Sequence, residues 1–223
     1  PCHGCGHEGK KDRKGWALTM GKAITISREH GCGGIELGKA LAESLGYEYI
    51  DKSIVVDLAK KMKTSQGMVS SLEDGDYLSL FKFINKFVGE STIQTIVSQS
   101  KDLAYVNSEK YRAGLHGLMN DLADRGNVVI VGRGGQFILR NRADVVHVRV
   151  VAPLEYKKKF LASKASISLQ EAETIIKAKE EERRKYHEKM FNGSNTDPTL
   201  YHIIINIALV TRPIAVEIIQ KLL

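Results

Sequence analysis

A short apolar strand that leads through a glycine-rich loop into a helix sets the fold class of this chain. Residues 23–27 read AITIS, a β-branched run typical of a buried strand. Apolar residues then recur with helical spacing from Ile35 to Leu45, and Gly46 ends the pattern. A second strand is predicted at 47–50 (YEYI). This order predicts a βαβ unit, and therefore parallel strands with a right-handed crossover.

The alternation of strands and helices resumes in the second half of the chain. Further strands are predicted at 128–131, 145–151 and 201–206. Further helices are predicted at 111–124, 154–165, 169–190 and from Pro213 onward. Apolar strands that alternate with helices predict an α/β protein with an open, doubly wound parallel sheet.

The stretch between these halves carries no strand signal. After a helix predicted at 53–62, one helical stripe is formed by Leu78, Phe81, Ile84, Phe87 and Val88. Such a stripe is typical of core packing or of a seam between two copies of a chain. We therefore interpret residues from about 64 to 110 as a helical insertion, through which a homo-oligomer is one expectation.

The first residues differ in character from the rest of the chain. Residues 1–19 are polar and rich in glycine and lysine, and they predict a flexible extension ahead of one domain at 20–223. Cys2 and Cys5 form a C-x-x-C pair followed by His7. A structural zinc site needs four ligands, and no second pair is apparent in the sequence, so this segment predicts no zinc site.

A formal net charge of +7 favours an anionic partner. The basic residues mix with acids, as in 177–189, and no aromatic nucleic-acid-binding motif is found, so nucleic acid is an unlikely partner. No apolar run approaches the roughly 18–20 residues that cross a bilayer, and no signal peptide is visible. The sequence therefore predicts a cytoplasmic protein without a membrane partner.

Three loops follow predicted strands, where open α/β sheets bind their ligands. They are the first glycine loop at 27–34 (SREHGCGG), the segment 51–53, and the second glycine loop at 132–135 (GRGG). Glycines in the first loop allow backbone N–H groups to approach an anion at the N-terminus of the next helix. This arrangement predicts a phosphate site.

The first glycine loop departs from the phosphate-loop pattern G-x-x-x-x-G-K-[ST]. Arg28 takes the place of the first glycine, Gly34 that of the lysine and Ile35 that of the Ser/Thr. One alternative is a tight turn without a ligand. Another is a dinucleotide site, since Asp51 lies about 20 residues further on. Glu36 stands at the third glycine position of that fingerprint, which disfavours the dinucleotide interpretation.

Three longer stretches carry a resemblance to a known family. They are ISREHGCGG with LAESLGYEYIDKS, then VVIVGRGGQFILRNRADVVHVRVVAPLEYKKK, then IIKAKEEERRKYHEK with TDPTLYHIIIN. In order and spacing they resemble the phosphate loop, the G-R-D loop, and the lid and final strand of the cytidylate kinase-like branch of the nucleoside monophosphate kinases. The resemblance spans most of 20–223 except the insertion. It implies a P-loop kinase fold and transfer of the ATP γ-phosphoryl group, with Mg²⁺, to a nucleoside monophosphate or similar phosphorylated acceptor.

The chain departs from this family in three respects that bear on activity. Gly34 stands where the family has the phosphate-loop lysine, and Gly134 stands where the Asp of G-R-D helps to hold the nucleoside. The family's arginine shortly after the Asp-Ser/Thr pair is also missing here. A non-catalytic nucleotide- or phosphate-binding module of the same fold is therefore the alternative function.

The resemblance implies a role for several residues. The donor phosphates are expected at Ser27, Arg28, Gly31, Cys32, Gly33, Gly34, Ile35 and Glu36, and the acceptor at Asp51, Lys52 and Arg133. The metal ligands are not identified. Asp51 is expected to hold Mg²⁺-bound water, orient the acceptor or cap the following helix.

Three arginines are the predicted catalytic residues. Arg28 is expected to replace the missing lysine, because a guanidinium binds phosphate oxygens bidentately. The alternative is a surface arginine paired with Glu29 or Glu36. Arg183 and Arg184 lie in the predicted lid segment, 180–189, where positive charge would stabilise the transferring group. Their alternative is a solvated helix face.

Overall fold

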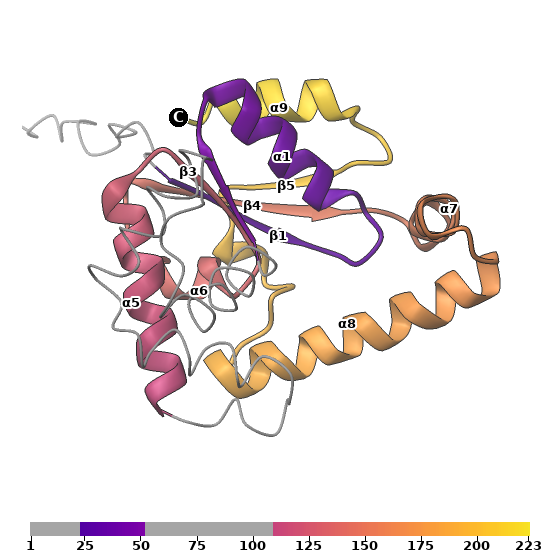
Figure 1. The fold of residues 1–223 in the computed structure, drawn as a ribbon, viewed down its shortest axis with the longest axis horizontal. Coiled ribbons are helices and arrows are strands. Elements are labelled where there is room, and N and C mark those ends of the chain that lie inside the picture. The colour runs from indigo at the N-terminus through magenta and orange to yellow at the C-terminus, as the bar shows by residue number, and fades with distance from the viewer. Residues whose placement is uncertain (1–22, 52–108) are drawn as a thin grey trace, which may run out of the picture.

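The computed structural model describes residues 23–51 and 109–223 (Figure 1). Its strands are β1 (Ala23–Arg28), β2 (Glu48–Ile50), β3 (Val128–Val131), β4 (Val145–Val151) and β5 (Ile203–Asn206). They form one parallel sheet in the order β2-β3-β1-β4-β5. The α/β class and the parallel sheet predicted from the sequence are confirmed.

The helices lie close to their predicted positions. They are α1 (Gly34–Leu45), α5 (Glu109–Arg125), α6 (Gly135–Ile138), α7 (Leu154–Ala165), α8 (Leu169–Phe191) and α9 (Arg212–Gln220), with a 3-10 turn at Pro198–Leu200. The short α6 was not predicted. No helix in 23–51 or 109–223 combines the length and apolar character needed to cross a membrane.

Two predicted segments fall outside the described residues. One is the extension at 1–19, and the other is the helix at 53–62 with the insertion at about 64–110, except that 109 and 110 open α5. Both assignments, and oligomerisation through the insertion, stay predictions.

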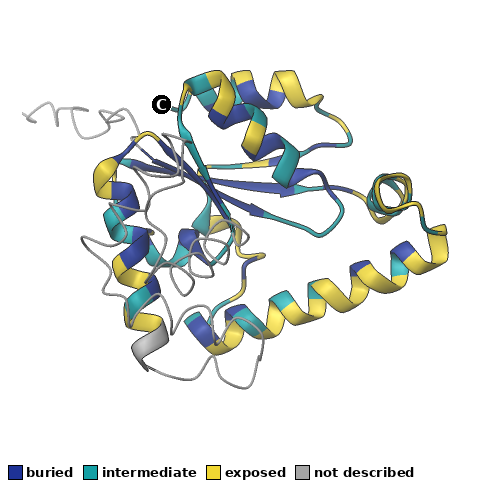
Figure 2. Ribbon diagram, viewed as in Figure 1, coloured by how far each residue is buried: buried dark blue, intermediate teal, exposed yellow. Residues whose placement is uncertain are grey.

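Helices cover both faces of the sheet (Figure 1). Alternate strand residues point to opposite faces, so Ile24 and Ile26 pack towards α1 and α9, whereas Ala23 packs towards α5. Val129 and Val131 of β3 likewise pack on the side of the sheet that α1 and α9 cover, and Figure 2 shows the strands buried between the layers. The doubly wound arrangement is therefore confirmed.

Beyond Ala23 and Val145, the face of β1 and β4 opposite α1 is polar. Thr25 Oγ1 lies 2.6 Å from His147 Nδ1, and Arg149 Nη1 donates to the carbonyl of Asn195 at 2.6 Å. All four residues are buried. Burial lowers the pKa of His147 to about 4, so its ring is neutral at neutral pH. Polar side chains thus line this face up to the carboxyl ends of the two strands.

Candidate functional site

The two glycine loops meet at one edge of the sheet. β1 and β3 are parallel neighbours, with Ile26 opposite Val131, so the loops that follow them leave the sheet side by side. The backbone N–H of Gly132 donates to the carbonyl of Ile26 at 2.9 Å. The prediction that both loops lie at the same edge is confirmed.

The first glycine loop turns through two left-handed glycines into α1. Gly31 and Gly33 have φ values of 80° and 79°, which side chains rarely adopt, and Gly33 caps α1. Cys32 anchors the loop between them, because its buried Sγ donates to the carbonyl of Glu29 at 3.1 Å. Burial raises the pKa of this thiol to about 11, so it stays protonated.

Helices α7 and α8 pack onto this loop. A Cβ at Gly31 would lie 3.1 Å from the carbonyl oxygen of Lys157 and 3.6 Å from Ile176 Cδ1. A Cβ at Gly33 would lie 3.5 Å from the Phe160 ring. The loop is therefore in contact with the helical hairpin that follows β4.

The Arg28 side chain runs from the start of α1 to the second glycine loop. A Cβ at Gly34 would lie 2.6 Å from Arg28 Cβ, and one at Gly132 would lie 2.0 Å from Arg28 Nη1. Burial, with a smaller effect from Arg183, lowers the pKa of Arg28 to about 10, so the guanidinium stays charged at neutral pH. Within the described residues, this side chain donates no hydrogen bond.

The expected alternative partners of Arg28 bind elsewhere. Glu29 accepts from Lys157 Nζ at 2.9 Å, and Glu36 pairs with Lys164. The interpretation of Arg28 as a surface arginine paired with either acid is therefore wrong. Glu29 and Glu36 instead tie the first glycine loop and α1 to α7.

The side chain of Arg28 leaves no space for a side chain at position 34. Gly34→Lys restores the standard lysine, but its Cβ would overlap Arg28 close to both backbones, where neither atom can move far. The variant should lose about 1–3 kcal/mol of unfolding free energy, as overpacked sites do. Urea denaturation should show that adding Arg28→Gly recovers most of that loss, as a coupling in the double-mutant cycle. A Gly34→Lys protein as stable as the parent would contradict this account.

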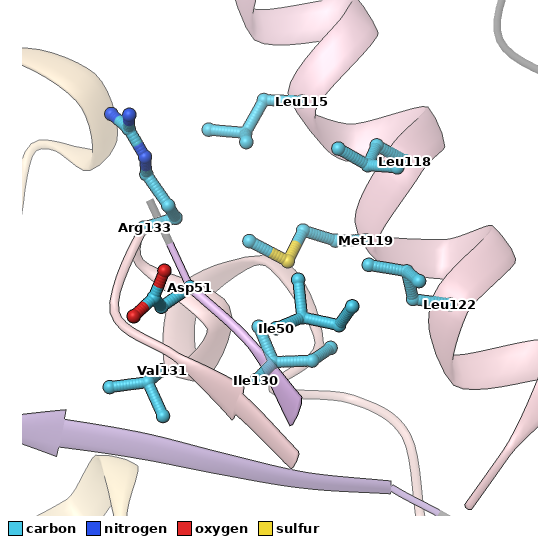
Figure 3. A pocket seen from close by; sticks show the side chains of 9 residues that line it. All are labelled: Ile50, Asp51, Leu115, Leu118, Met119, Leu122, Ile130, Val131 and Arg133. Atoms are coloured by element: carbon cyan, nitrogen blue, oxygen red, sulfur yellow. The ribbon is translucent and has the colours of Figure 1, made fainter. Parts of the chain in front are cut away.

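Asp51 and Arg133 line one pocket at the carboxyl ends of β2 and β3 (Figure 3). Figure 3 shows them on one side and the apolar side chains of α5 on the other. Tyr49 Oη donates to Asp51 Oδ2 at 2.8 Å, which fixes that carboxylate. The remaining lining residues are Ile50, Leu115, Leu118, Met119, Leu122, Ile130 and Val131. The structure thus brings together two predicted acceptor residues, and Lys52 lies outside the described residues.

Position 134 in the second glycine loop favours glycine for two structural reasons. Its φ is 73°, and a Cβ there would lie 2.2 Å from the Phe191 ring at the end of α8. That ring stacks on Phe137 with centroids 4.8 Å apart. The aromatic pair therefore occupies the space that an aspartate side chain at this position would need.

The two arginines of the predicted lid segment have different surroundings. Arg183 Nη1 donates to the carbonyl of Arg28 at 2.8 Å, so its side chain reaches the first glycine loop. Arg184 pairs with Glu181 at 2.7 Å and Glu188 at 2.6 Å on the exposed face of α8. The solvated-face interpretation therefore describes Arg184, whereas Arg183 lies at the candidate site.

Glu180 is a site residue that the sequence interpretation missed. Its carboxylate accepts a hydrogen bond from the backbone N–H of His30 in the first glycine loop and pairs with Arg183 at 2.6 Å. The available signal was its spacing of four from the apolar Ile176, which places both on one helix face.

The chain's own acids limit how a metal ion would be held. In the part of the chain that the structure describes, no three His, Cys, Asp or Glu side chains gather as a metal site. Mg²⁺ in kinases commonly takes one or two carboxylates together with substrate phosphates and waters. Asp51, at the carboxyl end of β2 beside Arg133, fits that donor set.

Comparisons with known proteins agree with this geometry. The profile of the cytidylate kinase-like family matches residues 23–209. The chain is 26% identical to a cytidylate kinase of Pyrococcus horikoshii over 184 residues, which cover 82% of this chain and 78% of that enzyme. It is 33% identical to a cytidylate kinase of Ignicoccus hospitalis over 101 residues, which cover 45% of this chain and 58% of that enzyme.

One crystal structure supports the fold. An uncharacterized protein from Eubacterium ventriosum superposes with a TM-score of 0.62 and 23% identity, covering 89% of this chain and 96% of that one. The parallel sheet with a glycine loop between β1 and α1 is the predicted P-loop kinase fold, and the chain belongs to the cytidylate kinase-like family.

Proposed function

We propose that the protein transfers the γ-phosphoryl group of ATP to a nucleoside monophosphate or a similar phosphorylated acceptor. The observation that carries this proposal is Arg28, a partly buried guanidinium between the two glycine loops with no hydrogen-bond acceptor among the described residues. Arg183 lies beside it. Two neighbouring cations at the N-terminus of a helix favour a multiply charged anion such as a triphosphate.

The donor phosphates would be bound by the first glycine loop. Backbone N–H groups near Gly31 and Gly33, together with the N-terminus of α1, would hold phosphate oxygens. Arg28 would contact the same oxygens bidentately, in the role of the absent lysine. Arg183, from the lid, would stabilise the charge that develops on the transferring group.

The acceptor would lie beside Asp51 and Arg133, at the carboxyl ends of β2 and β3. Arg133 would bind the acceptor phosphate, and Asp51 would orient the attacking oxygen in line with the donor. Asp51, together with the donor phosphates, would hold a Mg²⁺ ion, which would neutralise phosphate charge. Catalysis would then rest on positioning and charge stabilisation.

The alternative is a module that binds nucleotides without turning them over. The contact between Arg28 and Gly34 supports it, since a Cβ at Gly34 would lie only 2.6 Å from Arg28 Cβ and the position therefore has no space for the usual lysine. Steeply salt-dependent binding of DNA or RNA would instead indicate a nucleic-acid partner. The cytoplasmic location stays a prediction.

Product formation from ATP distinguishes these functions. The full chain should be incubated with ATP, Mg²⁺ and each nucleoside monophosphate, and ADP and the phosphorylated acceptor quantified by chromatography. We expect ADP formation that depends on one acceptor, and a rise in melting temperature with the same nucleotides. A rise in melting temperature without any product would support the binding module. The absence of both product and stabilisation would contradict both functions.

A further inference from the structure

Helix α8 buries one stripe of side chains, and two charged residues interrupt it. Ala172 and Ile176 precede the interruption, and His187 and Met190 follow it; all four are buried. Glu180 and Arg183 occupy the intervening positions at helical spacing. Their side chains are 31% and 19% exposed, so both are largely covered. The middle of the stripe therefore presents an ion pair, rather than apolar side chains, to its neighbours.

This ion pair faces the first glycine loop. The Glu180 carboxylate accepts from the His30 backbone N–H, and Arg183 Nη1 donates both to Glu180 and to the carbonyl of Arg28. Other acids of α8 behave differently. Glu181, the next residue, pairs with Arg184 and Lys185 on α8 itself.

A phosphate and the Glu180 carboxylate require the same donors. Backbone N–H groups of a glycine loop bind phosphate because they are oriented donors that carry partial positive charge. In this structure one of them, at His30, is satisfied by a carboxylate, which is also an anion. Arg183, the nearest lid cation, is held by the same carboxylate. An incoming phosphate at this position must displace Glu180.

We propose that Glu180 is an autoinhibitory latch, a carboxylate that occupies the phosphate position of the first glycine loop until a polyphosphate displaces it. Displacement breaks the contact between Glu180 and His30 and frees Arg183 to turn towards the phosphate. The proposal rests on the proposed function for the nature of the anion. It makes the lid and the phosphate loop one coupled switch.

The latch is tested by binding of a bare polyphosphate. Inorganic tripolyphosphate and ATP should be titrated calorimetrically, at one ionic strength, into the parent, Glu180→Ala, Glu180→Gln and Glu181→Ala. If the latch is closed about 90% of the time, removing it should tighten tripolyphosphate binding by about tenfold. Glu181→Ala removes the same charge from the next residue of α8 and should leave the affinity within about twofold of the parent, because surface charges act weakly.

A neutral ligand and the conservative variant make the result specific. Adenosine, which carries no phosphate, should bind the parent and Glu180→Ala alike. Glu180→Gln keeps an oxygen for the His30 N–H but loses the charge, so it should tighten tripolyphosphate binding to an intermediate extent. If Glu180→Ala does not fold, judged by its melting curve, Glu180→Gln decides the question.

The outcomes separate the latch from the proposed function. If the Glu180 variants bind tripolyphosphate more tightly than the parent and Glu181→Ala does not, the latch is supported, even if no acceptor is ever phosphorylated. Equal affinities in the Glu180 and Glu181 variants overturn the latch, even in an active kinase. Failure of all four proteins to bind tripolyphosphate overturns it as well.

Discussion

Replacing Arg28 with methionine should lower kcat/KM for ATP by about 100-fold, the scale on which a single preorganised charge contact acts. The same change should leave the melting temperature unchanged or raise it. Burial lowers the pKa of Arg28 to about 10, which means that its charged form is disfavoured where it lies. Methionine fills similar space without a charge, so stability should not fall when the guanidinium is removed.

A paired arginine provides the control for this change. Arg142 forms ion pairs with Asp124 and with Asp144, the latter at 2.6 Å, just before the amino end of β4 and away from the glycine loops. Arg142→Met should leave kcat/KM within about twofold and reduce stability slightly, as the loss of partly exposed ion pairs does. Full activity in Arg28→Met would mean that another cation binds the donor phosphates.

The fold was largely predictable because buried parallel strands have a strong local signal. The run VVIV at 128–131 was placed correctly, and the helix pattern that ends at Gly46 matches α1. Helix α6 was missed because it has only four residues and begins at Gly135, the last residue of the GRGG loop. The fixed directions of parallel strands also made it possible to expect both glycine loops at one edge.

The contacts within the site were harder to predict. Adjacent arginines on a helix lie about 100° apart, so the phase of the buried stripe decides which one faces the protein. The sequence pattern predicted the same role for Arg183 and Arg184. In the structure, only Arg183 lies near the buried stripe that Ile176 and His187 define. For the same reason, the sequence did not distinguish Glu180 from the other acids of α8. Its run of charged neighbours is typical of a solvated face, and only the tertiary contact with His30 distinguishes it.

Substituting these two arginines singly should now give unequal results. Arg183→Ala should lower kcat by about 100-fold, because its guanidinium lies at the first glycine loop and would bind the transferring group as charge develops. The dissociation constant for ATP should change much less, since that contact forms mainly in the transition state. Steady-state kinetics give kcat, and calorimetry gives the dissociation constant.

Arg184→Ala is the matched control, because it removes the same side chain from the next residue of the same helix. Arg184 pairs only with exposed acids of α8 among the described residues, and such surface pairs contribute little. Its kcat should therefore stay within about twofold of the parent, a range that surface charge changes allow. Hydrogen exchange across 180–189 should slow when ATP and acceptor bind, in the parent and in Arg184→Ala. If both variants have the kcat of the parent, or if hydrogen exchange in this segment is equally fast with and without the ligands, α8 is a structural helix and not a catalytic lid.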